Sequence, residues 1–275
     1  MTTTHSDTDL WLRRFGPAPD SGPLLVCLPH AGGSATYYFQ TSRALSSSMD
    51  VLAVQYPGRQ DRRGEPFIDD IGRLADAVAD AVRTAADRPL ILFGHSMGAT
   101  IGYEVAARLE DTGSADSGIE LLALFASGRR APSRIRSENV HRRDDAGIVA
   151  ELRRLQGTGA DLLGDDELIQ MILPAVRADY RAVESYRPEQ RPPLQCPIVA
   201  MTGDVDPQVS AEEAAAWEQH TSGDFTLHTY SGGHFFLDNH AAAILAEIRS
   251  VAEAAARVPE EGGENSTLDS PSGSM

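Results

Sequence analysis

The pentapeptide Gly94-His95-Ser96-Met97-Gly98 has the residue types and spacing that most directly suggest chemistry in this 275-residue chain. It follows an apolar run at 90–94 and precedes a helical pattern that extends from 96 to about 109. A serine on a tight strand-to-helix turn exposes its hydroxyl, and the two glycines leave room for neighbouring backbone. Free N–H groups at the start of the helix favour developing negative charge. We therefore predict that Ser96 is the nucleophile of an acyl transfer.

A serine hydroxyl needs a base, and after a turn of this kind the acid and then the histidine follow along the chain. His30 and His95 come too early in the sequence to satisfy that order. His234 lies between the last predicted strand, at 225–230, and the last predicted helix, at 239–256. Two glycines directly before it would let the backbone bring the ring to the serine. His234 is the predicted general base.

The carboxylate that orients the base should follow the preceding strand, PIVAMTG at 197–203, where Asp204 and Asp206 lie. We favour Asp206 because it lies further beyond the strand end and an Asp-Pro step fixes its loop. Asp204 remains the alternative and could instead be a loop-capping acid. Asp224 and Asp238 lie at the wrong ends of their predicted elements.

Acyl transfer also needs hydrogen-bond donors for the oxyanion of the tetrahedral intermediate. The backbone N–H of Met97, directly after the nucleophile, is one predicted donor. The other is the N–H of Ala31 in the loop Pro29-His30-Ala31-Gly32-Gly33, which resembles the HGGG loops of esterases. The His30 side chain would then shape the loop. The alternative is that this segment is only a strand-to-helix turn.

The elements that must position these residues alternate between strand and helix along the chain. Apolar runs predict strands at 24–29, 51–57, 90–94, 121–127, 197–203 and 225–230, and helical patterns occupy 34–46, 67–86, 96–109 and 239–256. This alternation predicts an α/β fold with a mostly parallel sheet covered by helices on both faces. The stretch 128–190 has no strand candidate and predicts a helical lid. We expect one domain over 9–258, with disordered ends at 1–8 and 259–275.

Composition excludes several classes of function. The formal net charge of -16 argues against a nucleic-acid binder and against docking on an anionic membrane. All basic residues are arginine, so Schiff-base chemistry and a P-loop lysine are excluded. The two cysteines, Cys27 and Cys196, lie in predicted strands and suggest buried thiols rather than a metal site. Neither a signal peptide nor a membrane span is apparent, so we expect a cytoplasmic protein, and nothing requires more than a monomer.

A family resemblance rests on six motifs that occur in order: CLPHAGGSATYY, QYPGRQDRR, GHSMGA, ILPAVRADYRAVESYR, CPIVAMTGDVDP and GGHFFL. Together they resemble the type II thioesterases of polyketide synthases and nonribosomal peptide synthetases, over roughly residues 10 to 250. The resemblance implies an α/β-hydrolase fold and an editing enzyme that releases acyl groups from the phosphopantetheine arm of acyl or peptidyl carrier proteins. It also implies Ser96, Asp206 and His234 as the triad, Ala31 and Met97 as oxyanion donors, and no metal or cofactor.

A basic segment at 129–143 contrasts with the acidic chain: six arginines and one glutamate give it a formal charge of +5. Such runs are usually solvated surface. The alternative is a docking surface for acidic carrier proteins, with Arg129, Arg130, Arg142 and Arg143 as the candidate residues. Three other functions stay open: a chain-releasing thioesterase, a general carboxylesterase with the same triad, and a non-catalytic module that binds carrier proteins.

Overall fold

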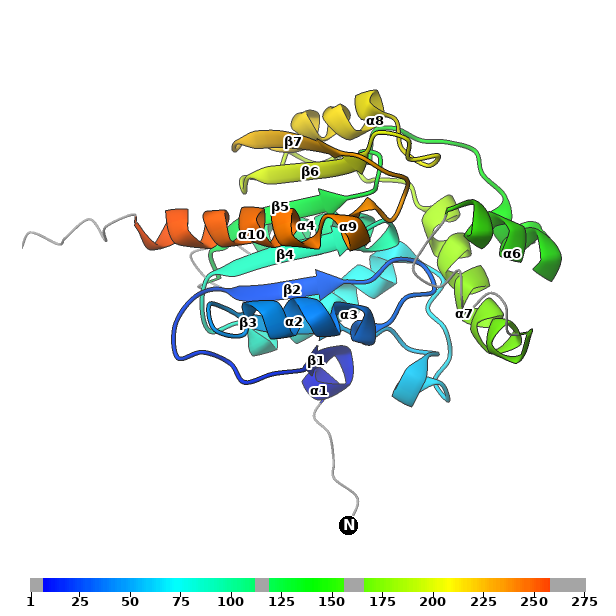
Figure 1. Cartoon of the computed structure of the whole chain (residues 1–275), viewed down its shortest axis with the longest axis horizontal. Helices are drawn as coiled ribbons and strands as arrows, with labels where there is room; N and C mark the ends of the chain where they lie inside the picture. The colour runs from blue at the N-terminus through cyan, green and yellow to red at the C-terminus, as the bar shows by residue number, and fades with distance from the viewer. Residues whose placement is uncertain (1–6, 112–118, 156–165, 258–275) are drawn as a thin grey trace, which may run out of the picture.

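A seven-stranded sheet with the order β1-β3-β2-β4-β5-β6-β7 forms the centre of the molecule (Figure 1). The computed structural model describes residues 7–111, 119–155 and 166–257. β2 to β7 pair in parallel, and only β1 is antiparallel, with Leu12 opposite Val54 of β3. The predicted, mostly parallel sheet is therefore confirmed. The strands are β1 (Leu12–Arg14), β2 (Leu24–Leu28), β3 (Asp50–Val54), β4 (Leu90–His95), β5 (Leu121–Ser127), β6 (Ile198–Gly203) and β7 (Phe225–Tyr230).

Helices cover both faces of the sheet, as the alternating pattern predicts. α3 (Ile71–Ala85) and α4 (Met97–Asp111) pack on one face, and α2 (Phe39–Leu45) and α10 (Ala241–Ala256) pack on the other. Every residue of β2, β3, β4 and β6 is buried, which explains why these strands are nearly continuous apolar runs. The shorter helical elements are η1 (Ala35–Tyr38), η2 (Gln60–Arg62), α8 (Ala211–Ala215), η5 (Ala216–His220) and α9 (Phe236–Asn239).

The first described element, α1 (Asp7–Trp11), corrects one predicted boundary. Disorder was expected through residue 8, yet Asp7 and Thr8 are helical. The reason lies at the end of the helix, where the Arg62 guanidinium stacks over the Trp11 ring at 4.4 Å from its centroid. The predicted C-terminal tail, 259–275, lies outside the described residues.

The insertion between β5 and β6 contains helices joined by irregular segments in its described parts, 128–155 and 166–190, where it forms no strand. It contains η3 (Val140–Arg142), α6 (Asp145–Arg154) and α7 (Asp166–Ser185). These elements share a small apolar cluster of their own, formed by residues such as Ile148, Leu173 and Val176. Figure 1 shows α6 and α7 beyond the carboxyl ends of the parallel strands. The insertion therefore lies beside the loops that follow the strands, where α/β sheets place their ligands. We refer to α6 and α7 below as the lid helices.

Candidate active site

Ser96 occupies a strained turn between β4 and α4. Its φ is +55°, a left-handed conformation that non-glycine residues rarely adopt. The turn is also crowded: a Cβ at Gly98 would lie 2.0 Å from the carbonyl oxygen of Leu28. The Ser96 N–H donates to the carbonyl oxygen of Ser127 on the neighbouring strand, at 2.8 Å. The glycine is therefore required for α4 to approach β2, and the strain at Ser96 turns its side chain away from the strand direction.

His234 and Asp206 come together although 28 residues separate them. His234 Nδ1 lies 2.9 Å from Oδ2 and 3.1 Å from Oδ1 of Asp206. The side chains are 2% and 0% exposed, so water does not compete with this contact. A carboxylate at Nδ1 fixes the proton on that atom and leaves Nε2 free to act as a base. The pair thus has the arrangement that a catalytic histidine and its orienting acid require.

Asp204, the alternative acid, has a different place. Its Oδ1 accepts a hydrogen bond from the N–H of Gly232 at 2.8 Å, and the residue is exposed. It therefore ties the loop after β6 to the loop that carries His234. This hydrogen bond is the one expected if Asp204 caps a loop instead of orienting the base.

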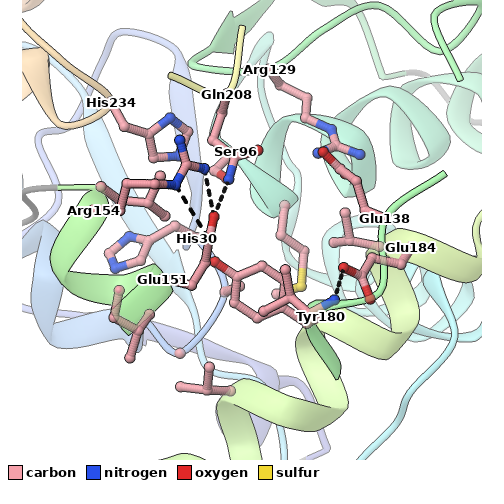
Figure 2. Close-up of a pocket in the computed structure, with 18 of the residues that line it drawn as sticks. His30, Ser96, Arg129, Glu138, Glu151, Arg154, Tyr180, Glu184, Gln208 and His234 are labelled. Atoms are coloured by element: carbon pink, nitrogen blue, oxygen red, sulfur yellow. Dashed lines mark hydrogen bonds and ion pairs between the residues drawn. The ribbon is translucent and has the colours of Figure 1, made fainter. Parts of the chain in front are cut away.

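The base and the nucleophile face a common cavity of about 580 Å³. Ser96 and His234 line it (Figure 2). Both predicted oxyanion residues, Ala31 and Met97, are also among its lining residues. No hydrogen bond joins Ser96 to His234 in the described part of the chain. Such bonds are often long in unliganded enzymes and shorten when substrate binds.

Two further histidines surround His234, and burial makes both poor bases. The ring centroid of His95 is 5.0 Å from that of His234 and 6.0 Å from that of His30. Burial, reinforced by the neighbouring histidines, lowers the pKa of His95 well below its ordinary value. Burial, with the charges of His234 and Arg59, lowers the pKa of His30 to about 3. Both rings therefore stay neutral at neutral pH, and of these three histidines only His234 has a carboxylate beside it.

The predicted oxyanion donors lie at two loop ends that face the cavity. Met97 is the first residue of α4, so its N–H is among those with no partner in the preceding turn. Ala31 lies in the loop after β2, and no acceptor for its N–H is found among residues 7–111, 119–155 and 166–257. Both N–H groups are therefore free to bind an oxyanion.

The lid helices contribute Glu151, Arg154 and Glu184 to the same cavity, and each of these side chains has a partner of opposite charge or a hydrogen-bond partner. Glu151 of α6 accepts hydrogen bonds from Arg154 at 2.6 Å and from Gln208 at 2.9 Å, as the dashed lines in Figure 2 show. Gln208 also donates its backbone N–H to Asp206 Oδ1 at 2.7 Å. The helix α6 is therefore connected to the loop that carries the acid of the triad.

Arg129 and Arg130, two of the four predicted docking residues, do not form an exposed basic surface. Arg130 is only 5% exposed and forms an ion pair with Glu138. Arg129 lines the cavity, and its Nε is buried with no hydrogen-bond partner among the described residues. Burial, with Arg130 nearby, lowers the pKa of Arg129 to about 10, so the guanidinium remains charged at neutral pH.

Arg142 and Arg143, the other two, are exposed. Arg143 is paired with Glu151 at 3.2 Å. Among the hydrogen bonds of the described residues, the Arg142 guanidinium donates only to the ring of its neighbour His141. Arg142 is thus the candidate whose charge is most available to a partner protein.

Sequence reasoning missed the role of Arg59 and of Asp179. Both belong to motifs that carry the family resemblance, yet neither residue was singled out in the sequence analysis. In the structure the two form a buried ion pair beside the oxyanion loop, with Arg59 Nη1 at 2.7 Å from Asp179 Oδ2. The signal available in the sequence was only that both residues lie within those motifs.

Both cysteines, Cys27 and Cys196, are buried, and burial raises the pKa of each thiol. Among the described residues, no group of three His, Cys, Asp or Glu side chains could hold a metal ion. In that same part of the chain, no helix is both long and apolar enough to cross a membrane.

Comparison with known proteins identifies the family. The model of the thioesterase domain family matches residues 23–251. The thioesterase PikA5 of Streptomyces venezuelae is 48% identical over 234 residues, which cover 85% of this chain and 82% of that protein. A probable cadicidin biosynthesis thioesterase of Streptomyces griseus is 47% identical over 250 residues, covering 90% of this chain and 67% of that one.

Solved structures agree. The type II thioesterase BorB from the borrelidin biosynthetic cluster matches with a TM-score of 0.84 and 51% identity, over 91% of this chain and all of that one. RedJ, a thioesterase from the prodiginine pathway of Streptomyces coelicolor, matches with a TM-score of 0.78 and 35% identity, over 87% and 95%. The chain belongs to the thioesterase family, has the α/β-hydrolase fold and is a hydrolase. The predicted resemblance to type II thioesterases is thereby confirmed.

Proposed function

We propose that this thioesterase hydrolyses acyl groups from the phosphopantetheine arm of acyl or peptidyl carrier proteins, and that it edits stalled or misprimed chains in polyketide or nonribosomal peptide synthesis. The contact between His234 and Asp206, beside the cavity that Ser96 lines, is the observation that carries the proposal. The printed names of the relatives, which describe biosynthetic and type II thioesterases, support the substrate class.

The mechanism uses a covalent acyl-enzyme. Nε2 of His234 removes the proton from Ser96 Oγ, which attacks the thioester carbonyl. The N–H groups of Ala31 and Met97 bind the oxyanion that forms. Collapse of the intermediate breaks the carbon–sulfur bond, and the pantetheine sulfur leaves with the proton that the imidazolium returns.

Hydrolysis of the acyl-enzyme repeats these steps with water. His234 removes a proton from a water molecule, which attacks the ester carbonyl of acylated Ser96. The free acid leaves, and the serine oxygen recovers its proton. Asp206 stabilises the imidazolium that forms in both halves of the reaction. The neutral rings of His30 and His95 add no competing positive charge beside it.

The second part of the proposal is that an acidic carrier protein docks near the cavity, and the positive charge of exposed arginines there supports it. Electrostatic attraction between an exposed basic site near the cavity and an acidic carrier would raise the association rate. Arg142 is the residue best placed for this role, and Arg143 is exposed beside it. Arg129 lines the cavity instead, and Arg130 is buried in its ion pair with Glu138.

The deciding experiment compares wild type with Ser96→Ala on a series of acyl groups loaded on one carrier protein, with release followed by mass spectrometry. We expect Ser96→Ala to fold and to release no acid above the uncatalysed rate. Release at the wild-type rate would refute the serine mechanism. Faster turnover of p-nitrophenyl esters than of acyl-carrier thioesters would favour a general carboxylesterase, and formation of cyclic products would favour a chain-releasing enzyme.

A further inference from the structure

A buried ion pair links the lid to the body of the enzyme. Arg59, in the loop after β3, donates to both carboxylate oxygens of Asp179 on α7, at 2.7 and 2.8 Å. The side chains are 9% and 1% exposed. Removing two charges from water costs free energy, so such a pair is weak evidence for a purely stabilising role. Its location therefore needs another explanation.

The same two residues hold the oxyanion loop from both sides. The N–H of Gly32 donates to Asp179 Oδ2 at 2.7 Å, and Arg59 Nη1 donates to the carbonyl oxygen of Gly33 at 3.2 Å. Gly32 directly follows Ala31, the predicted oxyanion donor. A hydrogen bond to a carboxylate is stronger than one between neutral groups, so the orientation of the adjacent peptide is well defined.

Packing brings the lid helix onto the same loop residue. Val176 lies one turn before Asp179 on α7, so the two side chains share a face of the helix. Gly32 has a φ of +77°, and a Cβ there would lie 2.7 Å from Val176 Cγ2. The helix thus contacts Gly32 through an apolar side chain and a carboxylate at once.

We propose that Asp179 is a positioning residue: by accepting the Gly32 N–H, it couples the seating of the lid helix α7 to the orientation of the oxyanion loop. When α7 is in place, the Ala31 N–H points toward the cavity. When α7 moves away, the loop loses its acceptor, and the oxyanion site is incomplete. The inference rests on the proposed serine mechanism.

Two double variants test this role, and both remove the two buried charges of the Arg59–Asp179 pair. Arg59→Leu with Asp179→Asn removes the ion pair but keeps a side-chain oxygen for Gly32. Arg59→Leu with Asp179→Leu removes that oxygen as well. Neither variant leaves an unpaired buried charge, which is the change that most destabilises a fold. The comparison therefore isolates the hydrogen bond to Gly32.

The readout is kcat and KM on a small acyl thioester, together with the affinity of a trifluoromethyl ketone that forms a tetrahedral adduct with the serine. Because loss of one oxyanion donor costs about 10²–10³ in kcat, a misaligned loop should cost at least about 10-fold. We expect kcat and ketone affinity to be at least about 10-fold lower in the Leu/Leu variant than in the Leu/Asn variant, with similar KM. Equal kcat and equal ketone affinity in the two variants would overturn the proposal.

A measurement on the wild-type protein guards against a variant that fails to fold. The Gly32 amide should exchange slowly with solvent deuterium, because its hydrogen bond to a buried carboxylate must break first. Rapid exchange would refute the coupling without any substitution. The proposed serine mechanism is tested separately by Ser96→Ala. If Ser96→Ala is inactive but the two double variants have equal kcat and equal ketone affinity, only the role of Asp179 is rejected.

Discussion

The carboxylate of Asp206 lies 2.9 Å from Nδ1 of His234, and the exposed fraction of each side chain is 2% or less. Replacing Asp206 with Asn should leave the ring in place but favour the wrong tautomer, because the amide nitrogen is a donor. We expect kcat to fall by about 10⁴-fold. Asp204→Asn is the matched control, since its remaining carbonyl oxygen can still accept from Gly232, and it should retain activity within a few-fold. A larger loss from Asp204→Asn would reverse the assignment of the acid.

Carrier recognition can be separated from catalysis at Arg142. Its guanidinium is exposed, so Arg142→Glu should weaken encounter with an acidic carrier and raise KM for acyl-carrier substrates several-fold at low salt. Small thioesters of N-acetylcysteamine should be turned over as in wild type. Arg257→Glu makes the same charge change at an exposed site at the end of α10 remote from the lid (Figure 1) and should not alter KM. An equal rise in KM for carrier-bound and small substrates would remove the support for docking.

Arg129 should influence which acyl group is accepted. Its charged side chain lines the cavity, and its Nε has no hydrogen-bond partner within the part of the chain that the structure describes. A carboxylate on the acyl group could therefore form a charge-assisted hydrogen bond with this guanidinium. Such a bond contributes about 1.5–3 kcal/mol, or about 10- to 100-fold in rate. We expect Arg129→Met to lower kcat/KM for malonyl thioesters by about this factor relative to propionyl thioesters.

The effect at Arg129 should be the same for carrier-bound and small thioesters, which distinguishes a cavity residue from a docking residue. An unchanged ratio of malonyl to propionyl turnover would show that the guanidinium does not contact the acyl group.

Acid should destabilise the fold through His95. Its folded-state pKa lies well below that of the unfolded chain, so below about pH 6.5 the unfolded state binds a proton that the folded state does not. The free energy of unfolding therefore falls as pH falls, approaching about 1.4 kcal/mol per pH unit for one such group. His95→Asn removes this group, and its urea unfolding midpoint should change less than that of wild type between pH 7 and pH 5. Identical pH dependence of the two proteins would contradict the assignment.

Much of the fold was predictable because β2, β3, β4 and β6 are buried on both faces and therefore form apolar runs that the sequence displays directly. The nucleophile turn was equally visible, since close backbone contacts exclude a side chain at Gly94 and Gly98 and therefore leave both glycines in the sequence pattern. β1 was not predictable: Leu12–Arg14 is a three-residue edge strand with one apolar residue, too short for any periodic signal.

The arginines show why burial is harder to predict than secondary structure. Arg130 lies in a basic run of the kind that is usually solvated surface, and Arg59 lies in the motif QYPGRQDRR. Both side chains are nevertheless buried, because Asp179 neutralises Arg59 and Glu138 neutralises Arg130. Asp179 is 120 residues from Arg59, and no local pattern encodes such a pairing. The charge of the 129–143 segment therefore did not predict the burial of Arg130, which an ion pair with Glu138 of the same segment makes possible.

The two buried cysteines make this protein convenient for site-specific labelling. With no accessible native thiol and no lysine side chain, a maleimide dye would react at one introduced cysteine only. Met171 on α7 is 69% exposed, so Met171→Cys would place that dye on the lid without disturbing its core. Fluorescence from a single reporter could then follow the movement of α7 during turnover, in an otherwise unmodified enzyme.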